Sequence, residues 1–244
     1  MVFSDTSTNT GILQQTRKMM GVDATQWPTA NIVASANNWL EYVAGYAIGA
    51  DKRFQWDDTN HTALPIGTTN MTSGTSDYSF LTDQQGNTIL TLTRIDMLLN
   101  VTTDTWTTLD MIDQNDPLFY GIGLQQAFSS NATPVYYDKI ADNIIRLYPT
   151  PNYSKTAGLK FYFQRTPSIF VAADTTKAPG VPSTLHRGFV TASAYDGALT
   201  LGLPNLQAIL SEREIERRNV VEYFTRRNND DVKPRMTMKR INYI

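Results

Sequence analysis

The apolar residues of this 244-residue chain change their spacing twice, and this change restricts the possible folds more than any other feature. Up to about residue 50, apolar side chains recur every three or four positions, which is typical of α-helices. From about residue 54 to 170, short stretches alternate apolar and polar side chains, as β-strands do. Helical spacing returns after about residue 182. This order predicts an α+β fold: a helical bundle built from the N- and C-terminal helices, with an inserted antiparallel β-domain.

The helical pattern is clearest where capping residues accompany it. Four helices are predicted, over residues 10–20, 29–49, 182–202 and 205–227. Gly21 is expected to end the first helix and Pro204 to follow the third. In the fourth helix Arg213 and Arg217 interrupt the apolar face, and Ile215 falls on the opposite side. The apolar face of this helix is therefore imperfect.

The central region is rich in Thr, Tyr, Val and Ile, with turn-forming residues every ten positions or so. Six strands are predicted, over residues 78–81, 89–93, 95–101, 135–137, 144–148 and 159–164. A hairpin loop is expected at 83–87 and a turn at 138–143. In the last strand Leu159, Phe161 and Phe163 share one face, which indicates a sheet covering a core. Short strands at regular intervals predict a sandwich or a small barrel.

The two ends of the chain differ in charge. The predicted parts are N-terminal bundle helices (1–50), the β-domain (51–175), C-terminal helices completing the bundle (176–231) and an extended tail (232–244). From Asn205 onward there are nine basic and six acidic residues, whereas the preceding residues include twelve basic and seventeen acidic ones. A basic end on an acidic body hints at a contact made by that end, and a solvated helix face explains it equally well.

Composition excludes several classes of chemistry. The chain has no cysteine, which excludes disulfide scaffolds, thiolate metal sites and cysteine nucleophiles, and its two histidines are too few for most histidine-built metal sites. The first residues lack the basic start and apolar run of a signal peptide, and no stretch reaches the ~18 apolar residues of a membrane span. A net charge of -2 gives no overall attraction to nucleic acid or anionic lipid.

Two groups of residues are candidates for catalysis. Asp110, Asp113 and Asp116 could hold Ca²⁺ or Mg²⁺, but the segment lacks the glycine and terminal glutamate of an EF-hand loop, and a solvated acidic turn is favoured. His186 could act as a general base, but no Gly-x-Ser-x-Gly motif accompanies it, and we expect a histidine on a helix surface. We therefore expect no enzyme, no metal and no cofactor. A hydrolase at these residues is a remote alternative.

Several short phrases follow one another in a characteristic order. They are WTTLD (106–110), TPVYY (133–137), IIRLYPTP (144–151), the strand 159–164, RTP (165–167), PGVP (179–182) and the helix beginning at Leu185. In IIRLYPTP two prolines end a strand. In this order the phrases resemble the head-to-tail adaptor, or connector, proteins of tailed bacteriophages. The resemblance extends from about residue 29 to 224.

The resemblance implies a structural protein of the virion neck. Copies would form a closed ring, of twelve to match a portal, that docks on the portal protein and connects the capsid to the tail. A downstream tail or nozzle protein would be the second partner. Double-stranded DNA would pass through the lumen without specific binding, and no membrane would be involved. The ring would be assembled in the host cytoplasm.

The helix 205–227 and the tail are the candidate segment for portal docking. Basic residues would supply charge complementarity: Arg226, Arg227, Lys233, Arg235, Lys239 and Arg240. Apolar residues would be buried at the interface: Met236, Met238, Ile241, Tyr243 and Ile244. Two alternatives stay open. One is another tail or neck component, such as a tail-completion or hub-proximal protein, and the other is a carbohydrate-binding receptor module using Trp56 and Trp106.

Overall fold

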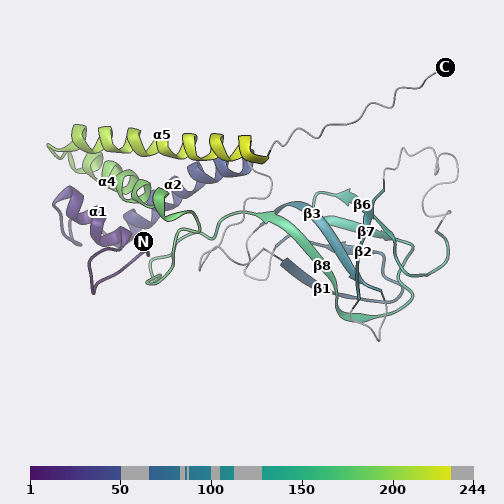
Figure 1. Cartoon of the computed structure of the whole chain (residues 1–244). Helices are drawn as coiled ribbons and strands as arrows, with labels where there is room; N and C mark the ends of the chain where they lie inside the picture. Colours follow the sequence, from purple (N-terminus) through teal and green to yellow (C-terminus); the bar gives the residue numbers. More distant parts are fainter. Residues whose placement is uncertain (51–65, 83–85, 87, 100–104, 113–127, 232–244) are drawn as a thin grey trace, which may run out of the picture. The chain divides into compact units, whose positions relative to one another are not determined.

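The chain folds into two compact units. The computed structural model describes residues 1–50, 66–82, 86, 88–99, 105–112 and 128–231 (Figure 1). The first unit combines both ends of the chain, Met1–Phe54 and Ile169–Ile244, and the second is the intervening segment Gln55–Ser168. Among the described residues, the first unit is helical and the second contains strands and loops. This arrangement confirms the predicted α+β fold with an inserted β-domain.

The described part of the first unit contains four α-helices and one short 3₁₀ helix. They are α1 (Ile12–Met20), α2 (Thr29–Ala50), η1 (Ser183–Leu185), α4 (Arg187–Leu201) and α5 (Leu206–Asp231). Helix α4 is central, because it packs against α1, α2 and α5 (Figure 1). As predicted, α1 ends at Gly21, whose φ of 73° is the left-handed conformation that glycine adopts readily.

Two glycines of α4 let large side chains approach its backbone. A Cβ atom on Gly188 would lie 2.6 Å from Cζ2 of Trp39, and one on Gly197 would lie 2.5 Å from Cε of Met20. Both distances are too short for real atoms. Only glycine therefore allows Trp39, which is 3% exposed, to pack so close to α4.

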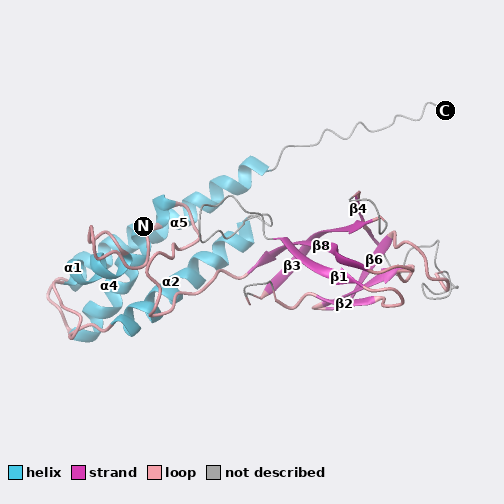
Figure 2. Ribbon diagram, turned by 90° about the horizontal axis from the view of Figure 1, so that it is seen from below, coloured by secondary structure: helices cyan, strands magenta, loops and turns pink. Residues whose placement is uncertain are grey.

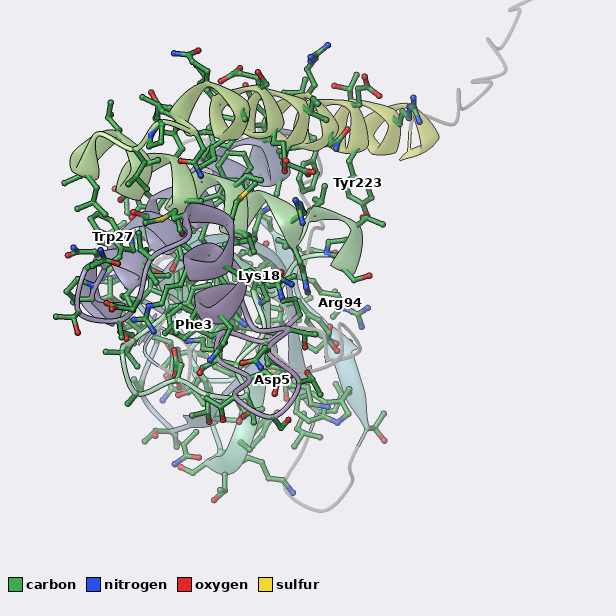
Figure 3. All side chains as sticks on the ribbon, turned by 90° about the vertical axis from the view of Figure 1, so that its left-hand side faces the viewer. Phe3, Asp5, Lys18, Trp27, Arg94 and Tyr223 are labelled. Carbon is green, nitrogen blue, oxygen red and sulfur yellow. The ribbon has the colours of Figure 1, made fainter. Side chains whose placement is uncertain are left out.

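The N-terminal segment completes the core of the helical unit. Phe3 is fully buried and stacks on Phe170 with ring centroids 4.9 Å apart, and Phe170 meets Phe189 of α4 edge-on at 6.1 Å. The backbone N–H of Phe3 donates to the carbonyl of Lys177 at 2.8 Å. Figure 3 shows Phe3 and Asp5 on this segment next to α1. Residues from opposite ends of the chain thus share one aromatic cluster.

The second unit is built from two four-stranded sheets within its described residues. One sheet has the strand order β1 (Ile66–Met71), β8 (Lys155–Arg165), β3 (Ile89–Leu98) and β4 (Trp106–Thr108). The other has the order β2 (Asp77–Ser79), β7 (Ile144–Tyr148), β6 (Tyr136–Ala141) and β5 (Asp110–Met111). Strands β3 and β8 form the long central pair of the first sheet (Figure 2).

A single core joins the two sheets. Leu159, Phe161 and Phe163 of β8 point into it, as their alternation predicts, and they share it with Ile145 and Leu147 of β7. Because the inner faces of both sheets contribute to one cluster, the unit is a β-sandwich. Of the two architectures predicted, the structure selects the sandwich.

One long strand replaces two predicted ones. The sequence predicts separate strands over 89–93 and 95–101, but β3 runs through both as far as Leu98. Its pairing with β8 is irregular between Leu92 and Arg94. Such an irregularity interrupts the strict alternation of side chains, which is why the sequence pattern breaks there. Residues 100 and 101, and most of the loop predicted at 83–87, lie outside the described residues.

The turn predicted at 138–143 is also wrong. Strand β6 continues to Ala141 and pairs with β7, so only residues 142 and 143 form the turn. Asp138, a residue type common in turns, is 5% exposed and lies within the strand. Strand β5 pairs with β6 in parallel, so this sheet is mixed rather than wholly antiparallel as predicted.

Candidate partner interface

Helix α5 packs one face against the bundle and leaves the other in solvent. Ile209, Val220 and Phe224 are at most 3% exposed, and α5 contacts α4 and α2. Ile215 is 50% exposed on the other side, as predicted. The helix continues to Asp231, beyond its predicted end at residue 227, so that it leads directly into the basic segment 232–244.

The two arginines that interrupt the apolar face of α5 are packed against tyrosine rings. The guanidinium carbon of Arg213 lies 4.4 Å from the ring centroid of Tyr195, and that of Arg217 lies 5.1 Å from the centroid of Tyr42. Nε of Arg217 also donates to the Tyr42 hydroxyl at 3.4 Å, and this hydrogen bond raises the pKa of Arg217. Cation–π contacts of this kind let a charged side chain lie on the otherwise apolar face of α5 that packs against α2 and α4.

Most other charges on described parts of α5 are balanced. Arg226 forms an ion pair with Glu222 at 3.3 Å, and the two side chains are 81% and 61% exposed. Arg187 of α4 pairs with Glu212 at 2.8 Å. Tyr223 projects near the C-terminal end of the helix (Figure 3). Arg226 is therefore on the surface, where a partner could reach it, but it is not an unpaired charge.

The remaining predicted interface residues lie outside the described side chains. They are Arg227, Lys233, Arg235, Met236, Met238, Lys239, Arg240, Ile241, Tyr243 and Ile244. The backbone of Arg227 belongs to α5. The docking role of this segment stays a prediction.

His186 is not the surface histidine that the sequence predicts. Its side chain is buried, with Nε2 2.8 Å from the carbonyl oxygen of Val181 and Nδ1 2.8 Å from the terminal nitrogen of Met1. The prediction is wrong because the N-terminal segment and the residues before η1 cover the start of α4, and neither neighbour could be inferred from local sequence. Both ring nitrogens serve to hold the fold together.

Of the three aspartates considered as a metal site, the structure describes only Asp110. Asp110 is exposed on β5, where its N–H donates to the carbonyl of Val135 at 3.1 Å. Asp113 and Asp116 lie outside the described residues. Within those that are described, no three His, Asp or Glu side chains come together as metal ligands.

A comparison with known families decides the identity of the chain. The model of the family described as SU10 adaptor protein matches residues 11–228, which include the described helices and strands of both units. The chain belongs to the SU10 adaptor protein family. No curated protein matches it significantly.

Membership of this family makes the chain a structural adaptor protein of a bacteriophage. It is a virion component of the head–tail junction, whose partners are portal and tail proteins. The family is structural and is not known for enzymatic activity. None of this adaptor's described helices combines the length and apolar character needed to cross a membrane.

Of the two tryptophans considered for carbohydrate binding, the structure of this adaptor describes only Trp106. Nζ of Lys160 lies 3.7 Å from the centroid of the Trp106 ring, so a cation already covers one face of that ring. Trp56 lies outside the described residues. A sugar ring could therefore not stack on the face of Trp106 that Lys160 covers.

Proposed function

We propose that this adaptor forms a closed ring of twelve copies between portal and tail, and that it docks on the portal through the end of α5 and residues 232–244. The observation that carries the proposal is the position of this segment. The family match covers both units and ends at residue 228, and residues 232–244 shortly after it contain four basic and no acidic side chains. A ring subunit needs interfaces rather than reactive groups, which agrees with the composition.

The contrast between α5 and the tail supports docking by the tail. On α5, Arg217 and Arg226 are paired with glutamates one turn away. The tail contains Lys233, Arg235, Lys239 and Arg240 with no acidic residue among them. A segment of this composition suits an acidic partner surface, and its interspersed apolar residues would be buried on docking.

The acidic part of the chain suits the channel. The residues before Asn205 include seventeen acidic and twelve basic ones, so this part carries a net negative charge. Binding to duplex DNA depends on Lys and Arg that neutralise phosphates. A channel lined by the acidic part would let DNA pass without binding it. The β-sandwich would then contact neighbouring copies or the downstream tail protein.

The test is to mix the full chain with its portal and measure the particle mass by mass photometry. We expect complexes with one ring of twelve adaptors per portal ring. A truncated chain ending at Asp231 should keep its thermal unfolding temperature but lose docking. Docking by the truncated chain would contradict the tail assignment, and a fixed number of bound copies other than twelve would contradict the proposed stoichiometry.

A second variant separates the charge of the tail from its length. Changing Lys233, Arg235, Lys239 and Arg240 to Gln keeps the apolar residues and the length of the segment. We expect weaker docking that becomes less dependent on salt, because fewer ion pairs form with the portal. A matched control carries the same thirteen residues in scrambled order. Docking by the scrambled tail that equals that of the natural chain would show that charge alone suffices and that the apolar residues have no specific sites.

A further inference from the structure

The first sheet of the sandwich has two edge strands, β1 and β4, in the part of the chain that the structure describes. Strand β1 (Ile66–Met71) pairs with β8, and β4 (Trp106–Thr108) pairs with β3. An edge strand presents a row of backbone N–H and C=O groups that can pair with a strand from another molecule. The two edges of this sheet are therefore two candidate contact surfaces on each copy of the chain.

The edge strands of the two sheets differ in charge. Neither β1, with the sequence IGTTNM, nor β4, with the sequence WTT, contains a charged residue or a proline. In the second sheet both edge strands carry an aspartate, Asp77 in β2 and Asp110 in β5. Natural proteins place charges and prolines on edge strands to prevent pairing with other chains. Of the two sheets, the first is therefore the one suited to pairing between molecules.

The strand directions in the first sheet allow such pairing to repeat from copy to copy. Neighbouring strands are antiparallel throughout, in the order β1, β8, β3 and β4. Because four strands alternate in direction, β1 and β4 run in opposite directions. Neighbouring copies in a large cyclic ring differ by a small rotation, which nearly preserves the direction of each strand. Strand β4 of one copy, placed beside β1 of the next, therefore continues the antiparallel alternation.

We propose that β1 of each copy pairs with β4 of the next copy, so that the first sheets of neighbouring sandwiches join at each contact of the ring. The partner is a second copy of this chain, and the proposal rests on the ring proposed above. A head-to-tail contact needs two different surfaces on each copy, and the two edges supply them. Pairing of β1 with β1 would instead relate two copies by a twofold axis and close a dimer. Thr69 and Thr107 are partly exposed on the two edges, and Thr–Thr pairs are favourable across neighbouring strands.

Engineered disulfides test the pairing, since the chain has no cysteine of its own. Single cysteines are placed in turn at residues 67–70 of β1, and each variant is mixed with Thr107→Cys on the portal and oxidised. Within one copy β1 and β4 lie three strand spacings apart, about 14 Å, whereas a disulfide needs Cα atoms within about 7 Å. A disulfide between the two strands therefore reports a contact between copies.

We expect the mixed dimer to be the main covalent product for at least one of the four β1 positions. Ser79→Cys on β2 and Met111→Cys on β5 are the matched controls from the edges of the second sheet, and their mixture should give little dimer. Dimers formed mainly by the β1 variants alone would show pairing of β1 with β1 and would overturn the proposal. Complete rings without a mixed disulfide at any of the four positions would overturn it as well.

Hydrogen exchange tests the same pairing on the unmodified chain. When rings form on the portal, we expect amide exchange in β1 and β4 to slow by about tenfold or more, while β2 and β5 change little. Rings in which β1 and β4 exchange as fast as in the free chain would overturn the strand pairing and leave the proposed ring intact. Failure of the chain to form any ring would instead contradict the proposed function. In that case the cysteine mixtures, oxidised in concentrated solution without portal, decide the pairing: a mixed disulfide supports it, and its absence at all four positions overturns it.

Discussion

The β-sandwich and the helical unit treat their buried polar side chains differently. In the sandwich, Asp96 is 2% exposed, but its carboxylate accepts from Arg94 at 2.6 and 2.7 Å and from Thr108 at 2.8 Å. Thr108 lies directly opposite Asp96 on the neighbouring strand. In the helical unit, Arg213 lies over a tyrosine ring, and its buried Nε has no hydrogen-bond partner among the residues that the structure describes. Among the described residues, the buried polar side-chain atoms of the sandwich have partners, whereas several of those in the helical unit do not.

The same contrast holds for all buried side-chain atoms without a partner among the described residues. These atoms belong to Thr16, Trp27, Trp39, Ser193, Asn205 and Arg213, and all six residues are in the helical unit. In a sheet, a side chain meets neighbours directly across the strand. In a helix, the backbone groups bond along the axis, so a polar side chain on a buried face needs a partner from another helix or another molecule. The difference teaches that strand pairing gives the described polar side chains of the sandwich partners from neighbouring strands, whereas helix packing buries some polar side chains without one.

The largest expected effects come from removing one core ring in each unit. Phe189→Ala should destabilise the helical unit and Phe163→Ala the sandwich, each by about 3–5 kcal/mol, because each change leaves a large cavity. Hydrogen exchange measured by mass spectrometry should show faster exchange in α4 and α5 for the first variant and in β3 and β8 for the second. Equal acceleration in both units from either change would show that the two cores do not behave as separate structures.

A smaller effect is expected where a glycine allows close packing. Gly188→Ala places a Cβ 2.6 Å from the Trp39 ring and should lower the free energy of unfolding by about 1–3 kcal/mol. Gly45→Ala on α2 is the matched control, because no atom beyond the neighbouring backbone of its own helix lies within 4 Å of the added Cβ. This control should stabilise the chain by roughly 0.5–1 kcal/mol through helix propensity. Urea denaturation measures both, and a destabilising Gly45→Ala would contradict the packing explanation.

Acid should weaken the sandwich through its paired carboxylates. Burial raises the pKa of Asp96, but hydrogen bonds from Arg94 and Thr108 outweigh it and lower this pKa from its ordinary 3.8. The hydrogen bond from Arg146 likewise lowers the pKa of Asp77. Because both pKa values are lower in the folded state, their stabilisation is complete above about pH 3.8 and is lost as the pH falls through the folded values.

The variant Asp96→Asn tests this pH dependence. It should lower the free energy of unfolding at pH 7 by roughly 1–2 kcal/mol, since hydrogen bonds to a charged group are lost. Below pH 3.8 the difference from the unmodified chain should shrink, and denaturation at pH 7 and pH 3 measures it. The helical unit also has an acid-sensitive carboxylate: hydrogen bonds from Thr8, Ser7 and Thr10 lower the pKa of Asp5. A constant difference at both pH values would show that Asp96 acts by packing and not by its charge.

The helices and most strands could be predicted because their signals are local. The apolar spacing of α1 and α2, and the glycine after α1, lie within the element that they define. Strand β1 has no such signal, because its sequence IGTTNM contains few apolar residues and it forms by pairing with β8, about ninety residues later. Gly67 in this strand lies under Phe163, and an added Cβ would be 3.1 Å from the ring. Contacts between segments far apart in sequence are what the local pattern could not show.

The candidate site divides in the same way. The sequence shows that Arg213 and Arg217 interrupt the apolar face of α5. The tyrosines that contact them, however, come from α4 and α2. The packing of these arginines against tyrosines could therefore not be predicted, although charged residues on an otherwise apolar helix face were a signal that something unusual is packed there. The burial of His186 was missed because its partners, Val181 and Met1, come from a loop and from the N-terminal segment.

The smallest effect on stability is expected at Arg226, and there it separates folding from docking. Arg226→Gln removes an exposed ion pair with Glu222 and should change the free energy of unfolding by only about 0.2–0.5 kcal/mol. If Arg226 is part of the portal interface, the same change should slow association with the portal at low salt, and this difference should shrink at high salt. Glu222→Gln is the matched control: it breaks the same pair but leaves the arginine free, so association should not slow. Stopped-flow measurements give the association rates of both variants with the portal. Equal slowing in the two variants would mean that association depends on the Arg226–Glu222 ion pair and not on the positive charge of Arg226 alone.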